Sequence, residues 1–559
     1  MNSIALLLAA LVALISWLAP NHYLPWVSFH SQLAMAVAFA LAWLATLSRA
    51  IAPVALSPLT AASLALALVP PLQCAAGLIT YAGDAWLGTA YLLGLALSVW
   101  VGQRLGAGFG VERVLRHVAG LLIAAALLSM GLAMYQWLRL RGLGIFAADL
   151  PPNGRPFANL GQPNHLATLL FLGLCGVLTL YQERRMGRLG AALAAVFFTF
   201  GLAMTTSRTA WLAMLLLVAG LLALRRRAGL RIGRAETLGL GAVFVGWLVA
   251  WPAINDALLL SGGRALATQV GAGPRTILWS TAIEAIGRRP WFGYGWDQAL
   301  AAQSDVILDR PSLGRLMGNA HNLLLDLLLW VGVPLGAALF GGLLMWGWRH
   351  LRLARDPAAV GLLAMLAGIF AHALVELPLS YTYFLLPAGL IAGLLETRHA
   401  PPWRRLAPVH WMLAPSALAI GLTAFITVEY LRVEENVRTL RLEVARIGTG
   451  RIVSEAPELH LLTQWADYLR FARVEPRPGL SDAELAHMAQ VTRRFPFARA
   501  QFDEAVAQAL NNRPADAALT WRRLCNLQAP HECRRRQAEW RELADEHPQL
   551  KSVELPRLP

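Results

Sequence analysis

The chain has 559 residues with a mean hydropathy of +0.50, and 57% of its residues are hydrophobic while only 14% are charged. This composition excludes a soluble protein of the same length and indicates an all-α, polytopic helical membrane protein. The net charge of +15 comes from 48 Lys and Arg residues against 33 Asp and Glu residues. Because the arginines fall mostly in short loops between apolar runs, they indicate topology and contact with the phosphates of a lipid bilayer, although an arginine-rich genome would give the same excess. We therefore expect no nucleic acid partner.

Apolar runs of a length that crosses a bilayer, about 17–25 residues each, follow one another through the first 429 residues. The first run has no Lys or Arg before its apolar core, so we expect a retained helix and no cleaved signal peptide. About thirteen transmembrane helices are expected, near residues 2–19, 32–50, 54–70, 84–102, 114–138, 163–181, 189–206, 209–224, 235–254, 321–348, 357–375, 379–396 and 408–428.

Arginine clusters occur in every second loop between these runs, for example Arg184 and Arg185 after the sixth run and Arg225 and Arg226 after the eighth. By the positive-inside rule these loops are cytoplasmic, so the N-terminus is expected in the cytoplasm and the segment after residue 429 on the outer side. The polar segments that interrupt the apolar pattern then all fall on the outer face. They are Pro20–Trp26, Asn159–His165, Ser207–Arg208, residues 255–320 and His372–Tyr383.

Two domains are expected, a membrane domain over residues 1–429 and an outer α-helical domain over residues 430–559, where the chain becomes charged and amphipathic. The outer loop 255–320 is too long for a simple connector, and it contains an amphipathic helix from Arg275 to Arg288. Cys525 and Cys533 are eight residues apart, and the sequence leaves open whether they form a disulfide. Five aromatic residues of the long loop are expected at the lipid headgroups, namely Trp279, Trp291, Phe292, Tyr294 and Trp296.

The first polar motif, Asn159-Leu-Gly-Gln162-Pro163-Asn164-His165, stands at the start of an apolar run. Pro163 suits the first turn of a helix, and capping of that helix by Gln162 or Asn159 is one explanation of the motif, which we consider the less favoured one. The alternative is functional, because an imidazole from His165 and amides from Gln162 and Asn164 can hold sugar hydroxyls or a phosphate at the membrane surface.

Two arginines stand apart from the cytoplasmic clusters. Arg208 lies in the polar hinge Thr205–Thr209 between two apolar runs, and Arg275 opens the amphipathic helix. An arginine costs about 2.5–3.5 kcal/mol at the centre of a membrane helix and less at its end. Each arginine is compatible with an anchor at the lipid interface, and the functional alternative is a bidentate phosphate clamp.

A third cluster consists of His372, Glu376, Tyr381 and Tyr383. His372 and Glu376 are four residues apart and can share one helix face, so a His–Glu pair is available. An aromatic belt at a helix end explains the same residues without any function. No metal-binding signature accompanies them, and we expect neither a metal nor a cofactor.

The segment Gly318–Gly336 places Asn319, His321 and Asn322 at the mouth of a long apolar run. An imidazole in that position is accessible to water and yet adjoins a region of low dielectric constant. Histidine suits the removal of a proton from an attacking hydroxyl, and arginine suits a pyrophosphate leaving group. His321 is therefore the candidate catalytic residue, and Asn322 is a candidate for substrate binding.

Taken together, these motifs resemble those of the O-antigen ligase and polymerase superfamily. The segment Pro20–Trp26 and the outer helical tail resemble, more specifically, the bacterial protein O-oligosaccharyltransferases of the pilin-glycosylase (PglL) type. The segments that carry the wider resemblance are Asn159–His165, the Thr-Ser-Arg208 hinge, the Arg275 helix with Pro290-Trp-Phe-Gly-Tyr-Gly, and Ala320-His321-Asn322 with Gly332-Val-Pro-Leu-Gly336.

The resemblance implies an enzyme of the bacterial inner membrane whose site faces the periplasm. Such enzymes move a preassembled glycan en bloc from undecaprenyl pyrophosphate to Ser or Thr of a periplasmic protein such as a pilin, with inversion and without a metal. By the same resemblance, His321 activates the acceptor hydroxyl, and Arg208 and Arg275 bind the pyrophosphate. The other substrate-binding candidates are Gln162, Asn164, His165, Asn322, His372 and Tyr383, and Tyr381 competes with Tyr383 for its match.

Other functions compete with this interpretation. An O-antigen ligase, whose acceptor is lipid A core, and an O-antigen polymerase would use the same cluster of arginines, histidines and amides. A lipid-glycan transporter is a remote alternative, because transporters place charges at the membrane midplane within repeated halves. The sequence has no such repeat, and its polar segments are expected at one membrane surface.

Overall fold

The computed structural model describes residues 2–47, 54–152, 154–260, 275–309, 314–400, 406–407, 409–445 and 455–556. Residues 261–274 and 310–313 of the expected outer loop therefore lie outside the described part of the chain. The described residues form helices and loops, with one antiparallel pair of two-residue strands, β1 (Val54–Ala55) and β2 (Leu406–Ala407). Among them, eight helical segments are long and apolar enough to cross a membrane, and four apolar helices are shorter. The predicted all-α polytopic membrane fold is confirmed.

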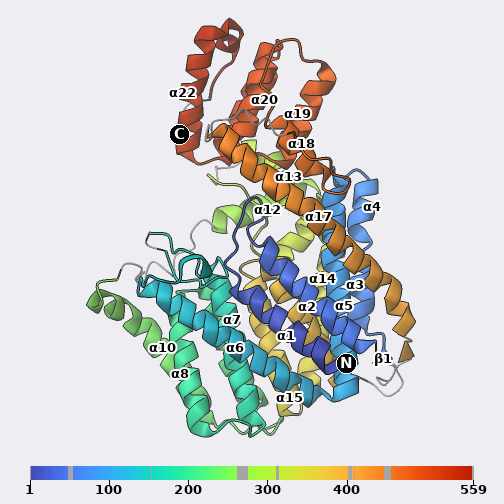
Figure 1. Cartoon of the computed structure of the whole chain (residues 1–559), viewed down its shortest axis with the longest axis vertical. Helices are drawn as coiled ribbons and strands as arrows, with labels where there is room; N and C mark the ends of the chain where they lie inside the picture. Colours follow the sequence, from blue (N-terminus) through green and yellow to red (C-terminus); the bar gives the residue numbers. More distant parts are fainter. Residues whose placement is uncertain are drawn as a thin grey trace. The chain divides into compact units, whose positions relative to one another are not determined.

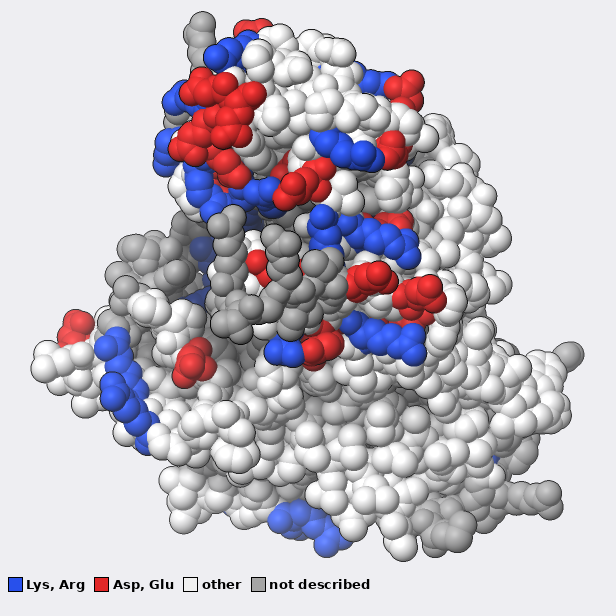
Figure 2. Space-filling view, turned by 45° about the horizontal axis from the view of Figure 1, so that its top comes forward, with Lys and Arg blue, Asp and Glu red and all other residues white. Residues whose placement is uncertain are grey.

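The chain divides into two compact units, each of which is discontinuous in sequence. The first unit consists of Met1–Ala67, Ala90–Gly271 and Gly342–Thr423, and the second of Leu68–Thr89, Ala272–Gly341 and Ala424–Pro559. The domain boundary expected at residue 429 stays a prediction. The visible face in Figure 2 carries a broad surface without charged side chains, as expected for helices that contact lipid.

Helix α7 (Pro163–Gln182) is the central helix of the first unit, and all its residues from Asn164 to Val177 are buried. Glycines allow neighbouring helices to approach it closely, since a Cβ added at Gly173 would lie 2.5 Å from the Cβ of Ala126. Helix α7 packs against α6 (Val111–Trp137), α8 (Arg188–Met204), α9 (Arg208–Leu224) and α15 (Pro357–Ala373). Figure 1 shows α7 beside α6 and α8.

The first unit contains further helices. Those that lie wholly within it are α1 (Asn2–Leu18), α2 (Phe29–Thr46), α3 (Pro58–Leu66), α10 (Arg234–Ala257) and α16 (Thr382–Arg398), with the short 3-10 turns η1 (Gly144–Phe146), η3 (Pro378–Ser380) and η4 (Val409–Met412). Three longer helices contribute residues to both units, namely α5 (Ala82–Phe109), α14 (Leu323–Leu353) and α17 (Leu413–Val444).

Helix α14 is broken at Gly332, which has a φ of 79° and a ψ of 170°. The loop after α12 (Arg275–Arg288) fills the break, because Tyr294 N–H donates to Leu329 O at 2.7 Å and Val333 N–H donates to Pro290 O at 2.7 Å. Only glycine fits at the break, since a Cβ on Gly332 would lie 2.2 Å from Trp291 O. Sequence analysis expected one uninterrupted helix here, and the bonds from the distant loop explain the difference.

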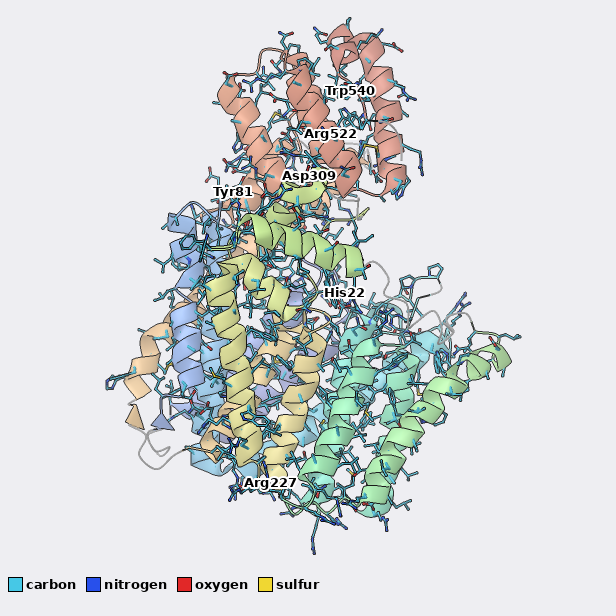
Figure 3. The ribbon with its side chains drawn as sticks, turned by 180° about the vertical axis from the view of Figure 1, so that it is seen from behind. His22, Tyr81, Arg227, Asp309, Arg522 and Trp540 are labelled. Atoms are coloured by element: carbon cyan, nitrogen blue, oxygen red, sulfur yellow. A yellow bond between two sulfur atoms is a disulfide. The ribbon has the colours of Figure 1, made fainter. Side chains whose placement is uncertain are left out.

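The C-terminal part of the second unit is a bundle of helices, and its core includes Phe502, Trp521 and Trp540, the last of which is labelled in Figure 3. A disulfide between Cys525 and Cys533 links the last two helices, so the pairing that the sequence left open is formed. The helices and turns of the second unit also include α4 (Val69–Ala75), α13 (Ala299–Val306), η2 (Ile307–Asp309), α18 (Thr463–Phe471), α19 (Asp482–Arg494), α20 (Ala498–Leu510), α21 (Pro514–Leu527), α22 (Pro530–Glu546) and η5 (Pro548–Ser552).

Candidate functional site

The candidate site residues fall into two groups, one in each unit, and each group is described by itself. The first unit holds Gln162, Asn164, His165, Arg208, His372 and Tyr383, and the second unit holds Arg275, His321 and Asn322.

The loop before α7 is held by buried side-chain amides. Asn159 donates from Nδ2 to Leu18 O at 2.7 Å and to Phe146 O at 2.9 Å, and its Oδ1 accepts from Ala148 N–H. Gln162 stands at the N-cap position of α7 with extended backbone angles, and Pro163 follows in the first turn. The expectation that Gln162 or Asn159 caps this helix is wrong, because no side chain caps it and Asn159 bonds to other segments instead.

Asn164 joins three segments of the first unit through its side chain. Its Nδ2 donates to Glu376 Oε1 at 3.1 Å, and its Oδ1 accepts from the hydroxyl of Ser207 at 2.7 Å. All three residues are buried. Because Ser207 precedes α9 and Asn164 lies in the first turn of α7, this bond brings the N-termini of two helices together.

His165 lies in an aromatic environment one residue further along α7. The hydroxyl of Tyr383 lies 2.9 Å from His165 Nδ1, and the ring of Tyr381 packs edge-on at a centroid distance of 4.5 Å. His372 lies beside it, with ring centroids 5.6 Å apart, and its Nδ1 is 2.7 Å from the Thr168 hydroxyl. The structure thus brings His165, His372 and Tyr383 together and gives both competing tyrosines a contact with His165.

A small cavity of about 70 Å³ adjoins this cluster. Gln162, His165, Tyr381, Tyr383 and His22 line it, together with residues of the loop between α1 and α2. His22 is labelled in Figure 3, and its two ring nitrogens lie 3.1 Å from Val27 O and Asn159 O. Sequence reasoning did not select His22, although it lies in the segment Pro20–Trp26 that contributed to the family resemblance.

Arg208 is the first residue of α9 and is half-buried. A second arginine lies at the same hinge, because Arg155 Nη1 donates to the carbonyl oxygens of Thr205 and Thr206 at 3.2 and 3.1 Å. Helix N-termini attract anions, and arginine binds phosphate oxygens well. Arg155 was missed because nothing in the sequence near it indicates a contact with residues 50 positions away.

In the second unit, His321 occupies a tight polar turn before α14, which we call the His321 turn (residues 319–322). His321 has a φ of +50°, which is uncommon for residues other than glycine. The side chain of Asn319 accepts from His321 N–H at 3.0 Å, and that of Asn322 accepts from Leu324 N–H at 3.0 Å and so caps α14.

Helix α12 makes a hydrogen bond to the His321 turn. Trp279 donates its indole N–H to Ala320 O at 3.0 Å, one residue before His321. Arg275 is half-buried at the N-terminus of the same helix, four residues before Trp279. Of the five aromatic residues expected at the headgroups, Trp291 and Phe292 are exposed, whereas Tyr294 and Trp296 are buried within the second unit.

Among the described residues, no group of three or more His, Cys, Asp or Glu side chains is arranged to hold a metal ion. The two groups offer different side-chain chemistry. The first group offers a buried amide and imidazole cluster beside two arginines, and the second offers a half-buried imidazole at the start of a membrane helix.

Three protein-family models match the chain. The model described as "Protein glycosylation ligase" matches residues 156–180, "O-Antigen ligase" matches 193–340, and "Virulence factor membrane-bound polymerase, C-terminal" matches 360–541. Every predicted site residue falls within one of these ranges.

Two proteins of Acinetobacter baylyi (strain ATCC 33305 / BD413 / ADP1) are similar to the chain. The general O-oligosaccharyltransferase is 29% identical over 500 residues, which cover 87% of this chain and 85% of the relative. The ComP-specific O-oligosaccharyltransferase is 26% identical over 334 residues, which cover 59% of each protein. These similarities confirm the resemblance of the motifs to O-oligosaccharyltransferases and to the O-antigen ligase family, and they indicate that the protein is a membrane glycosyltransferase.

Proposed function

We propose that this protein transfers a preassembled glycan en bloc from undecaprenyl pyrophosphate to Ser or Thr of periplasmic proteins such as pilins. The observation that carries the proposal is the meeting of the α7 and α9 N-termini at the Asn164–Ser207 hydrogen bond, beside Arg155 and Arg208. Two helix N-termini and two guanidinium groups suit the oxygens of a pyrophosphate, which is the charged group of a lipid-linked donor.

In the proposed reaction, the hydroxyl oxygen of the acceptor attacks the anomeric carbon of the glycan while the bond from that carbon to the phosphate oxygen breaks. The hydroxyl proton passes to His321, and the lipid pyrophosphate leaves with the bonding electron pair. Arg208 and Arg275 stabilise the charge that develops on the leaving group. A single direct displacement inverts the configuration at the anomeric carbon.

The remaining candidates bind and orient the substrates in this proposal. Gln162, His165 and Tyr383 line a cavity in the first unit, and their amide, imidazole and hydroxyl groups suit the hydroxyls of a sugar. Asn164 and His372 hold this cluster through buried hydrogen bonds. Asn322 caps α14 and thereby fixes the backbone next to His321.

We further propose that the protein lies in the bacterial inner membrane with its N-terminus in the cytoplasm and its site and C-terminal helices in the periplasm. The arginine-rich loops support this orientation through the positive-inside rule. The disulfide between Cys525 and Cys533 supports it independently, because disulfides persist in oxidising compartments such as the periplasm.

Ligation of O-antigen to lipid A core is the second candidate, and polymerisation of lipid-linked glycans is the third. The descriptions of the matched family models favour them, since these name O-antigen ligase and a membrane-bound polymerase. All three reactions use the same kind of donor and differ in the acceptor.

The test uses the full chain and its His321→Ala variant in a bacterial host that supplies one defined undecaprenyl-linked glycan. Mass spectrometry of a co-expressed periplasmic pilin is expected to find the glycan on Ser or Thr with the unaltered enzyme and not with the variant. The matched control is His531→Ala, which removes an exposed histidine (71% exposed) from the C-terminal bundle. Unmodified pilin together with glycan on lipid A core would favour the ligase, and equal modification by His321→Ala would exclude His321 as the base.

A further inference from the structure

A buried carboxylate lies in the first turn of α14, three residues into an apolar helix. Asp326 is 4% exposed, and it is the only charged residue between Leu323 and Trp348. Burial of a carboxylate in an apolar helix is costly unless the group is hydrogen-bonded or paired. Sequence analysis did not select Asp326, although an acid in the middle of the run Leu-Leu-Leu-Asp-Leu-Leu-Leu is a visible signal.

The carboxylate is bonded to the residue that precedes His321. Asp326 Oδ1 accepts from Ala320 N–H at 2.6 Å, while Ala320 O accepts from the indole of Trp279 at 3.0 Å. Both polar groups of the Ala320 backbone are thus fixed from two different helices. Because His321 follows in a left-handed conformation, these bonds help to hold it there.

The carboxylate also lies within electrostatic range of the imidazole. The titratable groups with which Asp326 interacts electrostatically, among the described residues, are His321 and Asp297. The interaction with His321 is attractive when the imidazole is protonated, and the one with Asp297 is repulsive. A negative charge at Asp326 is therefore close enough to attract a positive charge that forms on the imidazole during the reaction.

We propose that Asp326 is a positioning residue for His321, which orients the imidazole and stabilises the imidazolium that forms during glycan transfer. This inference rests on the proposed role of His321 as the base. The acceptor hydroxyl gives its proton to His321 while its oxygen bonds to the anomeric carbon and the lipid pyrophosphate leaves. Asp326 stays ionised throughout, and the imidazolium later releases its proton to water. The arrangement follows the physical logic of an acid that orients a catalytic histidine without itself accepting the proton.

A purely structural role, in which Asp326 only holds the Ala320 backbone, would also explain the bond to Ala320. The Asp326→Asn variant distinguishes this structural role from the proposed electrostatic one. An asparagine keeps a side-chain oxygen that accepts from Ala320 N–H, but it carries no negative charge. The Asp326→Ala variant removes both. The matched control is Asp309→Asn, which removes an exposed acid (66% exposed) that pairs with Arg288 in the same unit and is labelled in Figure 3.

The experiment measures glycan transfer to an acceptor protein by the purified full-length variants in detergent, as kcat and KM for acceptor across pH, together with the melting temperature. For Asp326→Asn we expect an unchanged melting temperature and KM, a kcat lowered by about 10²- to 10⁴-fold, and a rising limb of the rate–pH profile displaced to lower pH. Asp309→Asn is expected to match the unaltered enzyme in all four quantities.

The outcomes separate this inference from the proposed function. If Asp326→Asn transfers glycan at the unaltered rate while Asp326→Ala loses both fold and activity, the carboxylate only holds the backbone and the inference is overturned. If Asp326→Asn loses kcat with a lower melting temperature, the same conclusion follows, because loss of fold explains the rate. If His321→Ala remains active in the same assay, the proposed base is wrong, and the inference falls with it.

Discussion

The polar cluster of the first unit and the His321 turn of the second unit are held by different kinds of hydrogen bond. In the first unit, side chains bond to side chains of other helices, and Asn164, Glu376, His165 and Tyr383 are each at most 7% exposed. In the second unit, side chains bond mainly to the backbone of the turn itself, and His321 is half-buried.

This difference suits two different tasks. A buried network whose members satisfy one another specifies one geometry and resists change, which favours the recognition of a fixed chemical group. A half-buried imidazole on a fixed backbone can instead meet a substrate and exchange a proton with it. This division is consistent with the proposal that the first cluster binds substrate and the second performs the chemistry, and the predictions below test it.

The largest effect is expected at His321, where His321→Asn separates the shape of the turn from the chemistry of the ring. Asparagine tolerates a positive φ better than other non-glycine residues, so the turn and the melting temperature should be retained. Glycan transfer should fall by about 10²- to 10⁴-fold because no base remains. Measured transfer at the unaltered rate with His321→Asn would show that the turn matters only for its shape.

The second effect concerns the stability of the first cluster. Asn164→Leu removes the partners of Glu376 and Ser207 and leaves their buried polar groups with one bond fewer, so we expect a loss of about 3 kcal/mol in unfolding free energy. Thermal unfolding in detergent measures it. The control Thr179→Val removes only a bond to Cys175 O within α7 and should be nearly neutral. Equal stability of the two variants would mean that the network contributes little to holding the first cluster.

The third prediction concerns the pH dependence of stability that arises from a buried carboxylate outside both clusters. Asp503 in α20 is 6% exposed, and burial raises its pKa to about 6, although Arg499 opposes the shift. Because the folded state binds this proton more tightly than the unfolded chain, with its pKa of about 3.9, the contribution of Asp503 to stability is fully present below about pH 4 and is lost as the pH rises through about 6. The loss amounts to about 2–3 kcal/mol.

Melting temperatures between pH 4.5 and 7.5 check this dependence. Asp503→Asn should flatten the profile and raise stability at pH 7.5, whereas Asp516→Asn, at an exposed acid of α21 (54% exposed), should leave the profile unchanged. A profile that is the same in all three proteins would exclude Asp503 as its cause.

The smallest effect is expected at Tyr383, whose hydroxyl bonds to His165. Tyr383→Phe keeps the ring and removes one buried hydrogen bond, so it should cost about 1 kcal/mol of stability and raise KM for the lipid-linked donor. Tyr381→Phe keeps the edge-on contact with His165 and should cost less. The two variants decide between the tyrosines that the family resemblance left in competition, and a larger loss with Tyr381→Phe would reverse the assignment.

Several features of the protein could be predicted because they depend on neighbouring residues. Hydropathy over windows of about 20 residues identified the membrane class and most of the helices. Pro163 marked the start of α7, and the polar residues around His321 marked the start of α14. The family resemblance likewise came from short motifs, and the similarities to whole proteins confirmed it.

The expectation for the candidate site was right about which segments contain polar residues and incomplete about what those residues bind. Asn159 was one of two residues that could have capped a helix, and it instead bonds to segments 13 and 141 residues away. Arg155 and His22 were not selected, because each bonds to the backbone of a distant segment that no local pattern indicates. Asp326 was also not selected, although its place within an apolar run is visible in the sequence.

The sequence by itself therefore determined the membrane class, the helical segments and the polar turns at their ends, because hydrophobicity and capping act within a few residues. Tertiary structure alone decided that Asn164 bonds to Glu376 across 212 residues, that Tyr383 bonds to His165 across 218, and that a loop breaks α14 at Gly332. Buried polar groups need partners, and in a membrane protein those partners come from whichever helices pack together. That choice depends on the packing of the whole chain.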